Sequence, residues 1–342
     1  MINGHGDDAF LYDHIDVNFS SNIYTHFDHS TLLEHLAQQL GHISSYPEPA
    51  PVSLERELAQ RLGIQPDEVC VTHGATEAIY LAAQAYSGAR SAILQPTFSE
   101  YADACRMHHH RLASIYNVED IPTDCDILWI CNPNNPTGTV LPASVIADIL
   151  REGEAESEGT RRMLILDQSY AAFTDQRTLT AAEAVELGNC LMLHSMTKEY
   201  AVPGLRIGYI TGPAALLEPV RRMRLPWSVD ATATTAAFYL LRHRSDYSID
   251  IASLMAERKR IALSINALGF VEAWPSDSHI LLCRLRMGIA SALKDYLARR
   301  HGLLIRDASN FEGLSPAFFR IAVQAPSDND RLIRAIAQWM TE

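Results

Sequence analysis

Short, nearly continuous apolar runs alternate with longer segments of mixed polarity over the first two thirds of the chain. Such runs are typical of strands that are buried on both faces of a parallel sheet. The alternation predicts a doubly wound α/β fold with a mostly parallel sheet. The predicted strands are 68–72, 91–95, 127–131, 163–166, 190–194 and 207–211.

The pattern changes beyond about Asp230. A long helical stretch leads there into short strand-like runs at 279–285, 303–306 and 319–323. A chain of 342 residues is long enough for one large domain with a smaller one attached. We therefore expect three parts: an N-terminal segment that packs on the small domain, a large domain, and a smaller α+β domain. The expected bounds are 1–40, 41–230 and 231–342.

Lys198 ends the run His-Ser-Met-Thr-Lys, and Arg206 follows eight residues later. A lysine amine can hold an aldehyde as a Schiff base. The hydroxyls of Ser195 and Thr197 and the guanidinium of Arg206 can bind a phosphate. Together these residue types describe a site for pyridoxal phosphate.

Polar residues that follow predicted strands supply groups for the ring of this cofactor. Asp167 closes the apolar run 163–166 and can pair with the protonated pyridine nitrogen, and Tyr170 can hydrogen-bond the phenolic oxygen. The rigid turn at 132–138 can aim the Asn135 amide at the same oxygen.

A candidate phosphate site lies earlier, where Gly74, Ala75 and Thr76 follow a predicted strand and begin a helix. Free backbone N–H groups and the helix dipole favour an anion at such a position, and the Thr76 hydroxyl adds a donor. Taken singly, each of these pieces also has an ordinary explanation as a helix cap, a turn or a helix start.

The order and spacing of the pieces resemble the fold type I pyridoxal phosphate enzymes, the aspartate aminotransferase superfamily, from about Tyr46 to the C-terminus. The resemblance implies an α/β large domain with a mostly parallel, seven-stranded type of sheet and a smaller α+β domain. It implies pyridoxal 5'-phosphate as the cofactor, with Lys198, Asp167 and Tyr170 as the catalytic residues.

The same resemblance implies further roles. Phe98 matches the aromatic residue that stacks on the cofactor ring. Tyr46 matches a tyrosine that reaches the cofactor phosphate of the partner subunit, which implies a homodimer. Arg320 matches the arginine that binds the substrate α-carboxylate through two hydrogen bonds. Asn22 lies where relatives carry an Asn-Pro pair near the substrate.

Three stretches resemble the threonine-phosphate decarboxylase family more than the related histidinol-phosphate aminotransferases: His5-Gly6, 200–206 and 304–314. The resemblance implies decarboxylation of L-threonine O-3-phosphate in cobalamin biosynthesis, with Arg306 and His5 on the phosphate. The alternative is an aminotransferase that acts on histidinol phosphate or a related amino acid. A third reading, a protein of this fold that binds without catalysis, is disfavoured because every expected catalytic position is filled.

The composition of the chain restricts the classes of partner that the protein is expected to bind. A net charge of −13 argues against nucleic acid, and no apolar run approaches the roughly 20 residues that cross a bilayer. The acidic N-terminus lacks the features of a signal peptide, so a cytoplasmic enzyme with a small phosphorylated amino-acid substrate is expected. The six separate cysteines predict reduced, mostly buried thiols. The run His108-His109-His110 is interpreted as a solvated stretch, and no metal site is expected.

Overall fold

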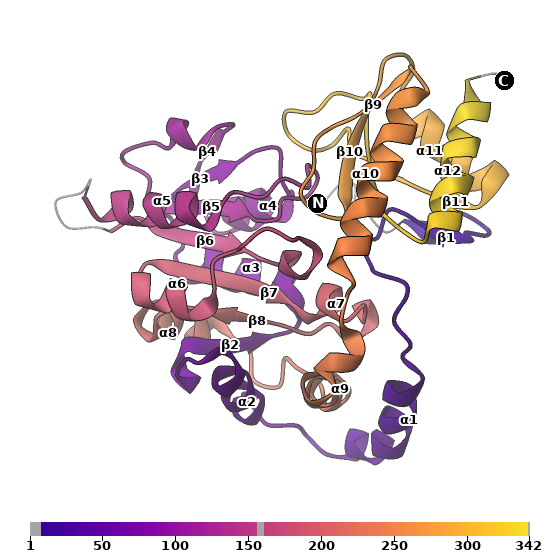
Figure 1. Cartoon of the computed structure of the whole chain (residues 1–342). Coiled ribbons are helices and arrows are strands. Elements are labelled where there is room, and N and C mark those ends of the chain that lie inside the picture. The colour runs from indigo at the N-terminus through magenta and orange to yellow at the C-terminus, as the bar shows by residue number, and fades with distance from the viewer. Residues whose placement is uncertain (1–7, 156–160, 341–342) are drawn as a thin grey trace.

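The computed structural model describes residues 8–155 and 161–340, which form two main sheets with helices packed around them (Figure 1). The larger sheet has seven strands in the order β2-β8-β7-β6-β5-β3-β4. Only β8 runs antiparallel to its neighbours, which confirms the predicted mostly parallel sheet. The strands are β2 (Val69–Thr72), β3 (Arg90–Leu94), β4 (Arg111–Ile115), β5 (Ile127–Cys131), β6 (Met163–Asp167), β7 (Cys190–Ser195) and β8 (Gly208–Thr211).

The central strands are buried at every position, as their apolar runs predict. Because successive side chains of a strand point to opposite faces, β5 contributes side chains to two apolar clusters. Trp129 packs in the cluster with α3 and α4, whereas Leu128 and Ile130 pack in the cluster with α5 and α6. Helices therefore cover both faces: α3 (Gly74–Ala85), α4 (Glu100–Met107), α5 (Ala143–Ala155), α6 (Ala181–Leu187) and α8 (Ala214–Met223).

The edge strand β4 was not among the predicted strands. Its exposure is mixed along the strand, since it pairs only with β3, and it therefore lacks a continuous apolar run. The preceding histidines correct a second expectation. His109 is exposed in a left-handed turn, but His110 is buried, with its ring nitrogens 2.8 Å from Ser91 Oγ and from the Ala83 carbonyl. The turn folds the third histidine inward, so the stretch is not solvated throughout.

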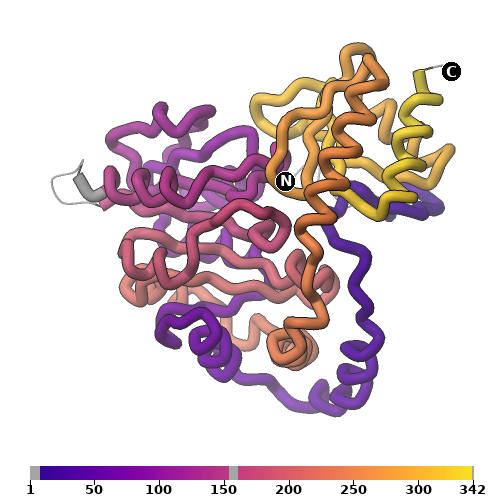
Figure 2. The backbone as a smooth tube through the Cα atoms, in the orientation of Figure 1, coloured from indigo at the N-terminus to yellow at the C-terminus, as the bar shows by residue number. Residues whose placement is uncertain are grey.

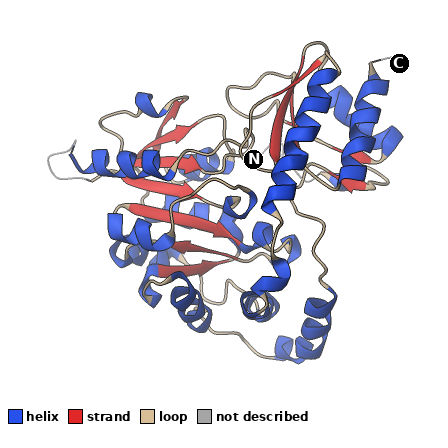
Figure 3. Cartoon of the chain, in the orientation of Figure 1, coloured by secondary structure: helices blue, strands red, loops and turns tan. Residues whose placement is uncertain are grey.

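A four-stranded antiparallel sheet in the order β12-β13-β10-β9 is the centre of a second part of the molecule. The seven-stranded sheet with its helices is called the first body below, and this part the second body. A strand near the N-terminus, β1 (Val17–Asn18), pairs in parallel with β11 (Leu303–Leu304), so an N-terminal segment lies against the C-terminal part of the chain (Figure 2). The remaining strands are β9 (Val271–Ala273), β10 (Ile280–Leu285), β12 (Arg306–Asp307) and β13 (Phe318–Ala322). The helices of the second body are α10 (Ile251–Ala267), α11 (Ala290–His301) and α12 (Pro326–Trp339) (Figure 3).

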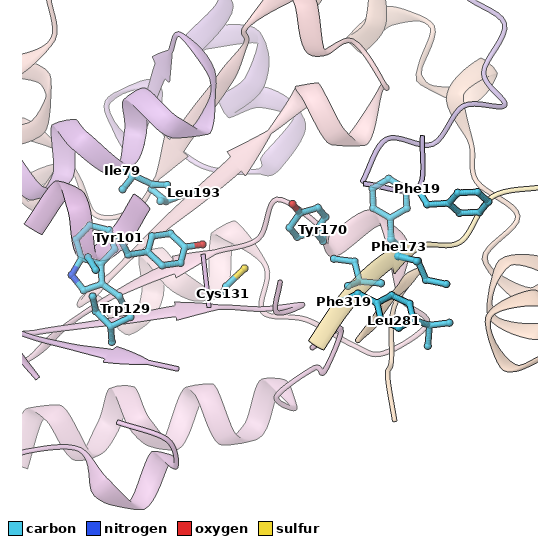
Figure 4. Packing of buried hydrophobic residues seen from close by; sticks show 14 of the residues in the cluster. Phe19, Ile79, Tyr101, Trp129, Cys131, Tyr170, Phe173, Leu193, Leu281 and Phe319 are labelled. Atoms are coloured by element: carbon cyan, nitrogen blue, oxygen red, sulfur yellow. The ribbon is translucent and has the colours of Figure 1, made fainter. Parts of the chain in front are cut away.

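The two bodies share one apolar core. Phe19, from the segment after β1, packs where Phe173 meets Leu281 and Phe319 (Figure 4). Further along the chain, α1 (Ser30–Gln39) contacts α9 (Ala231–Arg242), and both join an apolar cluster with α2 (Val52–Leu62) and β2. The expected domain bounds stay predictions.

The described cysteines are all free and buried, which confirms the expectation drawn from their spacing. Within residues 8–155 and 161–340, no helix is both long and apolar enough for a membrane span, and no group of three or more potential metal ligands gathers.

A buried ionic cluster fixes β2 against α2 and α8. The Glu55 carboxylate is 1% exposed and accepts hydrogen bonds from the Val71 amide at 3.0 Å and the Arg224 guanidinium at 2.6 Å. Arg221 approaches its second oxygen at 3.3 Å. Since β2 leads directly into α3, this cluster sets the position of the N-terminus of α3.

We predict that Glu55→Ala destabilises the protein by about 3–5 kcal/mol, because two arginines would lose the carboxylate that compensates their burial. Urea unfolding of the apoprotein measures the loss. Glu57→Ala in the same helix is the control. It breaks a partly exposed pair with Arg61 and should cost no more than about 1 kcal/mol. Equal losses for the two variants would contradict the prediction.

Candidate active site

A cavity of about 290 Å³ opens between the two bodies, where β5, β6 and β7 end and α3 begins. Ligand sites of α/β sheets form at the carboxyl ends of the strands, and this one also receives side chains from β13 and the segment after β1. The cavity brings together most of the predicted site residues: Asn22, Ala75, Thr76, Phe98, Asn135, Asp167, Tyr170, Ser195, Thr197, Lys198, Arg206, Arg306 and Arg320.

Two of the described residues that were predicted for the site, Gly74 and Tyr46, do not line the cavity. Gly74 lies just beside it, under the Arg206 guanidinium. Tyr46 is 86% exposed and packs against Trp227, with ring centroids 5.4 Å apart. His5 lies outside the described residues.

The first turn of α3 forms a cradle for an anion. Gly74 has φ +79°, and a Cβ there would come within 2.7 Å of Arg206 Nη2. A Cβ on Gly208 would come within 2.8 Å of the Ala75 amide nitrogen. Arg206 also donates to Thr197 Oγ1 at 3.3 Å. Backbone N–H groups, hydroxyls and a guanidinium thus converge where a phosphate fits, and larger side chains at either glycine would block it.

Asp167 provides a buried negative charge in the cavity wall. Its side chain accepts hydrogen bonds from Tyr101 Oη at 2.7 Å and from the Ser169 amide at 2.8 Å. Burial raises the pKa of Asp167, and these two hydrogen bonds oppose the rise. A buried carboxylate is stabilised by a cationic partner, so this position suits a protonated ring nitrogen.

Tyr170 and Asn135 present donors along the cavity wall. Burial raises the pKa of Tyr170 to about 12, so the phenol keeps its proton at neutral pH. Its oxygen accepts a hydrogen bond from Asn22 Nδ2 at 3.1 Å, which leaves its own proton for a ligand. Asn135 Oδ1 accepts from Arg320 at 2.6 Å, so the amide N–H groups of Asn135 are the part available to a ligand.

Lys198 lies on the single-turn helix α7 (Met196–Glu199), directly after β7. Its ammonium donates to the Ser21 carbonyl at 2.8 Å, which holds the amine over the cavity. Phe98 also lines the cavity and meets Tyr101 edge to face, with ring centroids 5.9 Å apart.

Arg306 and Arg320 are directly opposite each other on neighbouring antiparallel strands. Their exposures are only 7% and 2%, and burial lowers both pKa values, that of Arg320 to about 9. Arg306 donates to Asn310 Oδ1 at 2.8 Å and lies over the Phe311 ring. Like charges directly opposite one another destabilise a sheet, so anionic ligand groups at this point would offset a cost that the apoprotein carries.

Sequence reasoning assigned no role to several residues of the cavity. Tyr101 follows Phe98 by three residues, but Phe98 precedes α4, which begins at Glu100, so no helical spacing in the sequence links the two. Asn310 and Phe311 belong to the stretch 304–314, yet only the fold shows that they contact Arg306.

The family model of aminotransferase class I and II matches residues 14–336, so the chain belongs to this family. It is an enzyme that depends on pyridoxal phosphate, and the anion cradle, the buried carboxylate and the lysine of the cavity fit that cofactor.

Among its relatives, the chain is 27% identical to threonine-phosphate decarboxylase of Salmonella typhimurium over 95% of the chain and 91% of that protein. It is 26% identical to histidinol-phosphate aminotransferase 2 of Archaeoglobus fulgidus over 94% of the chain and 92% of that protein. Among solved structures, L-threonine-O-3-phosphate decarboxylase from Porphyromonas gingivalis matches with a TM-score of 0.92 and 35% identity. That match covers 95% of the chain and 100% of the other.

We predict that Tyr101→Phe weakens pyridoxal phosphate binding roughly tenfold to hundredfold, because the buried Asp167 carboxylate loses one of its hydrogen bonds and holds a ring cation less well. Equilibrium dialysis of the cofactor measures the change. Tyr80→Phe is the control. The Tyr80 hydroxyl donates to the Glu100 carboxylate over 2.8 Å, and neither residue lines the cavity. Unchanged cofactor affinity in Tyr101→Phe would refute this role.

Proposed function

We propose that the enzyme decarboxylates L-threonine O-3-phosphate. The observation that carries the proposal is the buried pair of Arg306 and Arg320 in one cavity with Lys198 and Asp167. Two buried guanidiniums call for two negative groups on the ligand. The similarity to the two threonine-phosphate decarboxylases supports the same reading.

The register of the two arginines favours a short substrate. Residues directly opposite in an antiparallel pair have Cβ atoms about 4.5–5.5 Å apart, so the two guanidiniums start from neighbouring positions and can bind two anionic groups of one small molecule. Threonine phosphate carries its phosphate on the carbon next to the one that bears the carboxylate. Histidinol phosphate has a phosphate and no carboxylate, so it would engage only one of the arginines, whereas 2-oxoglutarate, the other substrate of such an aminotransferase, would offer a carboxylate to each.

Each residue then has a defined task. Bound pyridoxal phosphate supplies the electron sink that accepts the electron pair of the broken bond. Asp167 keeps the ring nitrogen protonated, and Tyr170 and Asn135 hold the phenolic oxygen. Arg320 orients the carboxylate and Arg306 the phosphate. After carbon dioxide leaves, Lys198 delivers a proton to Cα, which gives (R)-1-amino-2-propanol O-2-phosphate. His5 is proposed as a second phosphate ligand, and Asn22 as a wall of the substrate site.

A second candidate is an aminotransferase for histidinol phosphate or a related amino acid, and the similarity to histidinol-phosphate aminotransferase 2 favours it. There Lys198 would move a proton between the substrate Cα and the C4′ carbon of the cofactor. The shared residues serve either reaction, because the choice depends on which Cα bond stands perpendicular to the ring.

We further propose a cytoplasmic homodimer in which Tyr46 reaches the cofactor phosphate of the partner subunit. Tyr46 is highly exposed, and so are apolar residues along the same stretch and around Trp227. Exposed apolar side chains of this kind are typical of protein interfaces. They include Leu40, Ile43, Leu225 and Trp227.

The decisive assay follows carbon dioxide from L-threonine O-3-phosphate in the absence of any keto acid. We expect catalytic release, lowered roughly 10- to 100-fold in kcat/KM by Arg306→Met, because a charge-assisted hydrogen bond to the phosphate is lost. Arg284→Met is the control. Arg284 belongs to β10, the strand that neighbours β13, and its guanidinium lies over the Phe318 ring, outside the cavity.

No release of carbon dioxide would refute the decarboxylase. If histidinol phosphate instead converts the bound cofactor to pyridoxamine phosphate, and 2-oxoglutarate restores it, the aminotransferase is the function.

The dimer proposal predicts complementation between two impaired variants. Lys198→Ala should be inactive, and Tyr46→Ala should bind the cofactor weakly. A mixed dimer would contain one site with both residues intact. Mixing the two after mild dissociation should therefore restore activity, up to about half of wild type per mixed dimer. A mixture no more active than Tyr46→Ala alone would exclude a site shared between subunits.

A further inference from the structure

The chain turns back directly after β12, and this turn carries a polar side chain to the cavity. The Ser309 amide donates to Asp307 Oδ1 at 2.9 Å, and the Phe311 amide donates to the Ala308 carbonyl at 3.2 Å. A turn that is closed by its own side chain and backbone in this way has a defined shape. It places Asn310, four residues after Arg306, in the wall of the cavity.

Asn310 and Phe311 hold the Arg306 guanidinium from two sides. Arg306 Nη2 donates to Asn310 Oδ1 at 2.8 Å, and the guanidinium carbon lies 5.4 Å from the centroid of the Phe311 ring. Arg306 and Phe311 are buried, whereas the Asn310 side chain is exposed. The ring thus supports the cation from the apolar side, and the amide meets it on the side that is open to a ligand.

The orientation of the Asn310 amide follows from the chemistry of its partner. A guanidinium has only donors, so Asn310 must turn its oxygen toward Arg306. The nitrogen is bonded to the same carbon as that oxygen, so its N–H groups lie next to the guanidinium. Arg306 and Asn310 both line the cavity, and together they form a corner of the wall to which a ligand can only offer acceptors.

Such a corner distinguishes two kinds of anion. The planar fork of a guanidinium binds a carboxylate through two parallel hydrogen bonds, which occupy both carboxylate oxygens. A phosphate group has three strong acceptor oxygens that are not in one plane. It can therefore receive hydrogen bonds from Arg306 and still offer an oxygen to the Asn310 N–H.

We propose that Asn310 is a specificity-determining residue, which donates its amide N–H to an oxygen of the group bound by Arg306 and so selects a phosphate over a carboxylate. The inference rests on the proposed function, in which Arg306 binds the substrate phosphate. The same preference would work against 2-oxoglutarate, whose second anionic group is a carboxylate.

The test compares two ligands that differ only in this anionic group. 4-Phosphonobutanoate and glutarate have carbon chains of the same length, and neither has an amine that could react with the cofactor. Titration calorimetry of the holoenzyme at mildly alkaline pH gives both dissociation constants. We expect Asn310→Ala to weaken phosphonate binding roughly tenfold and glutarate binding by less than about threefold, because one charge-assisted hydrogen bond is lost only with the phosphonate.

Two control variants separate selection from support of the arginine. Phe311→Leu removes the ring beside the guanidinium and leaves the amide, so it should weaken both ligands by a similar factor. Asn117→Ala removes another exposed amide, which donates to Asp120 at 3.1 Å outside the cavity, and should change neither constant. Because Asn310 is exposed, Asn310→Ala should melt at the wild-type temperature.

The outcomes distinguish failure of this inference from failure of the proposed function. If Asn310→Ala weakens both ligands equally, or neither, Asn310 does not select the anion. If it weakens the phosphonate alone but L-threonine O-3-phosphate releases no carbon dioxide, the selection stands and the decarboxylase is refuted. If Arg306→Met binds the phosphonate as tightly as wild type, Arg306 is not the phosphate ligand, and both proposals fail.

Discussion

The burial of opposite charges in the wall of one cavity is the constraint on which this structure depends. Asp167 is desolvated at the end of β6, and Arg306 and Arg320 are desolvated on the neighbouring body. Burial makes each of these charges costly, and the cavity wall that carries them combines aromatic side chains with hydroxyl and amide groups. A cofactor with a ring cation and a substrate with two anions would compensate these charges, so binding and charge compensation are the same event.

The two sheets position these charged side chains in different ways. Parallel strands end at one edge of the large sheet, so residues far apart in sequence, such as Asn135, Asp167 and Lys198, converge there without direct pairing. In the antiparallel sheet, register alone places Arg306 opposite Arg320. The cavity lies where these two arrangements meet, and Phe19 of the N-terminal segment fills the apolar space beside it.

The large sheet and the residues at its edge could be predicted because buried parallel strands leave continuous apolar runs, and polar residues directly follow those runs. What could not be predicted depends on contacts between distant segments. The edge strand β4 has no such run, and the inward turn at His110 needs the backbone conformation of His109. The hydrogen bond from Tyr101 to Asp167 and the register of the two arginines appear only once helices and strands are packed together.

The path of the chain between the two bodies has a mechanical consequence. The chain crosses from one to the other between β1 and α1, and again between α9 and α10 (Figures 1 and 2). With two separate covalent links, a rotation about the line that joins them is the relative motion of the bodies that would strain the connecting chain least. Arg306 and Arg320 belong to one rigid sheet and would swing together about that axis. Opening and closing of the cavity would thus carry both anion-binding groups toward or away from Lys198 at once, without altering the distance between them.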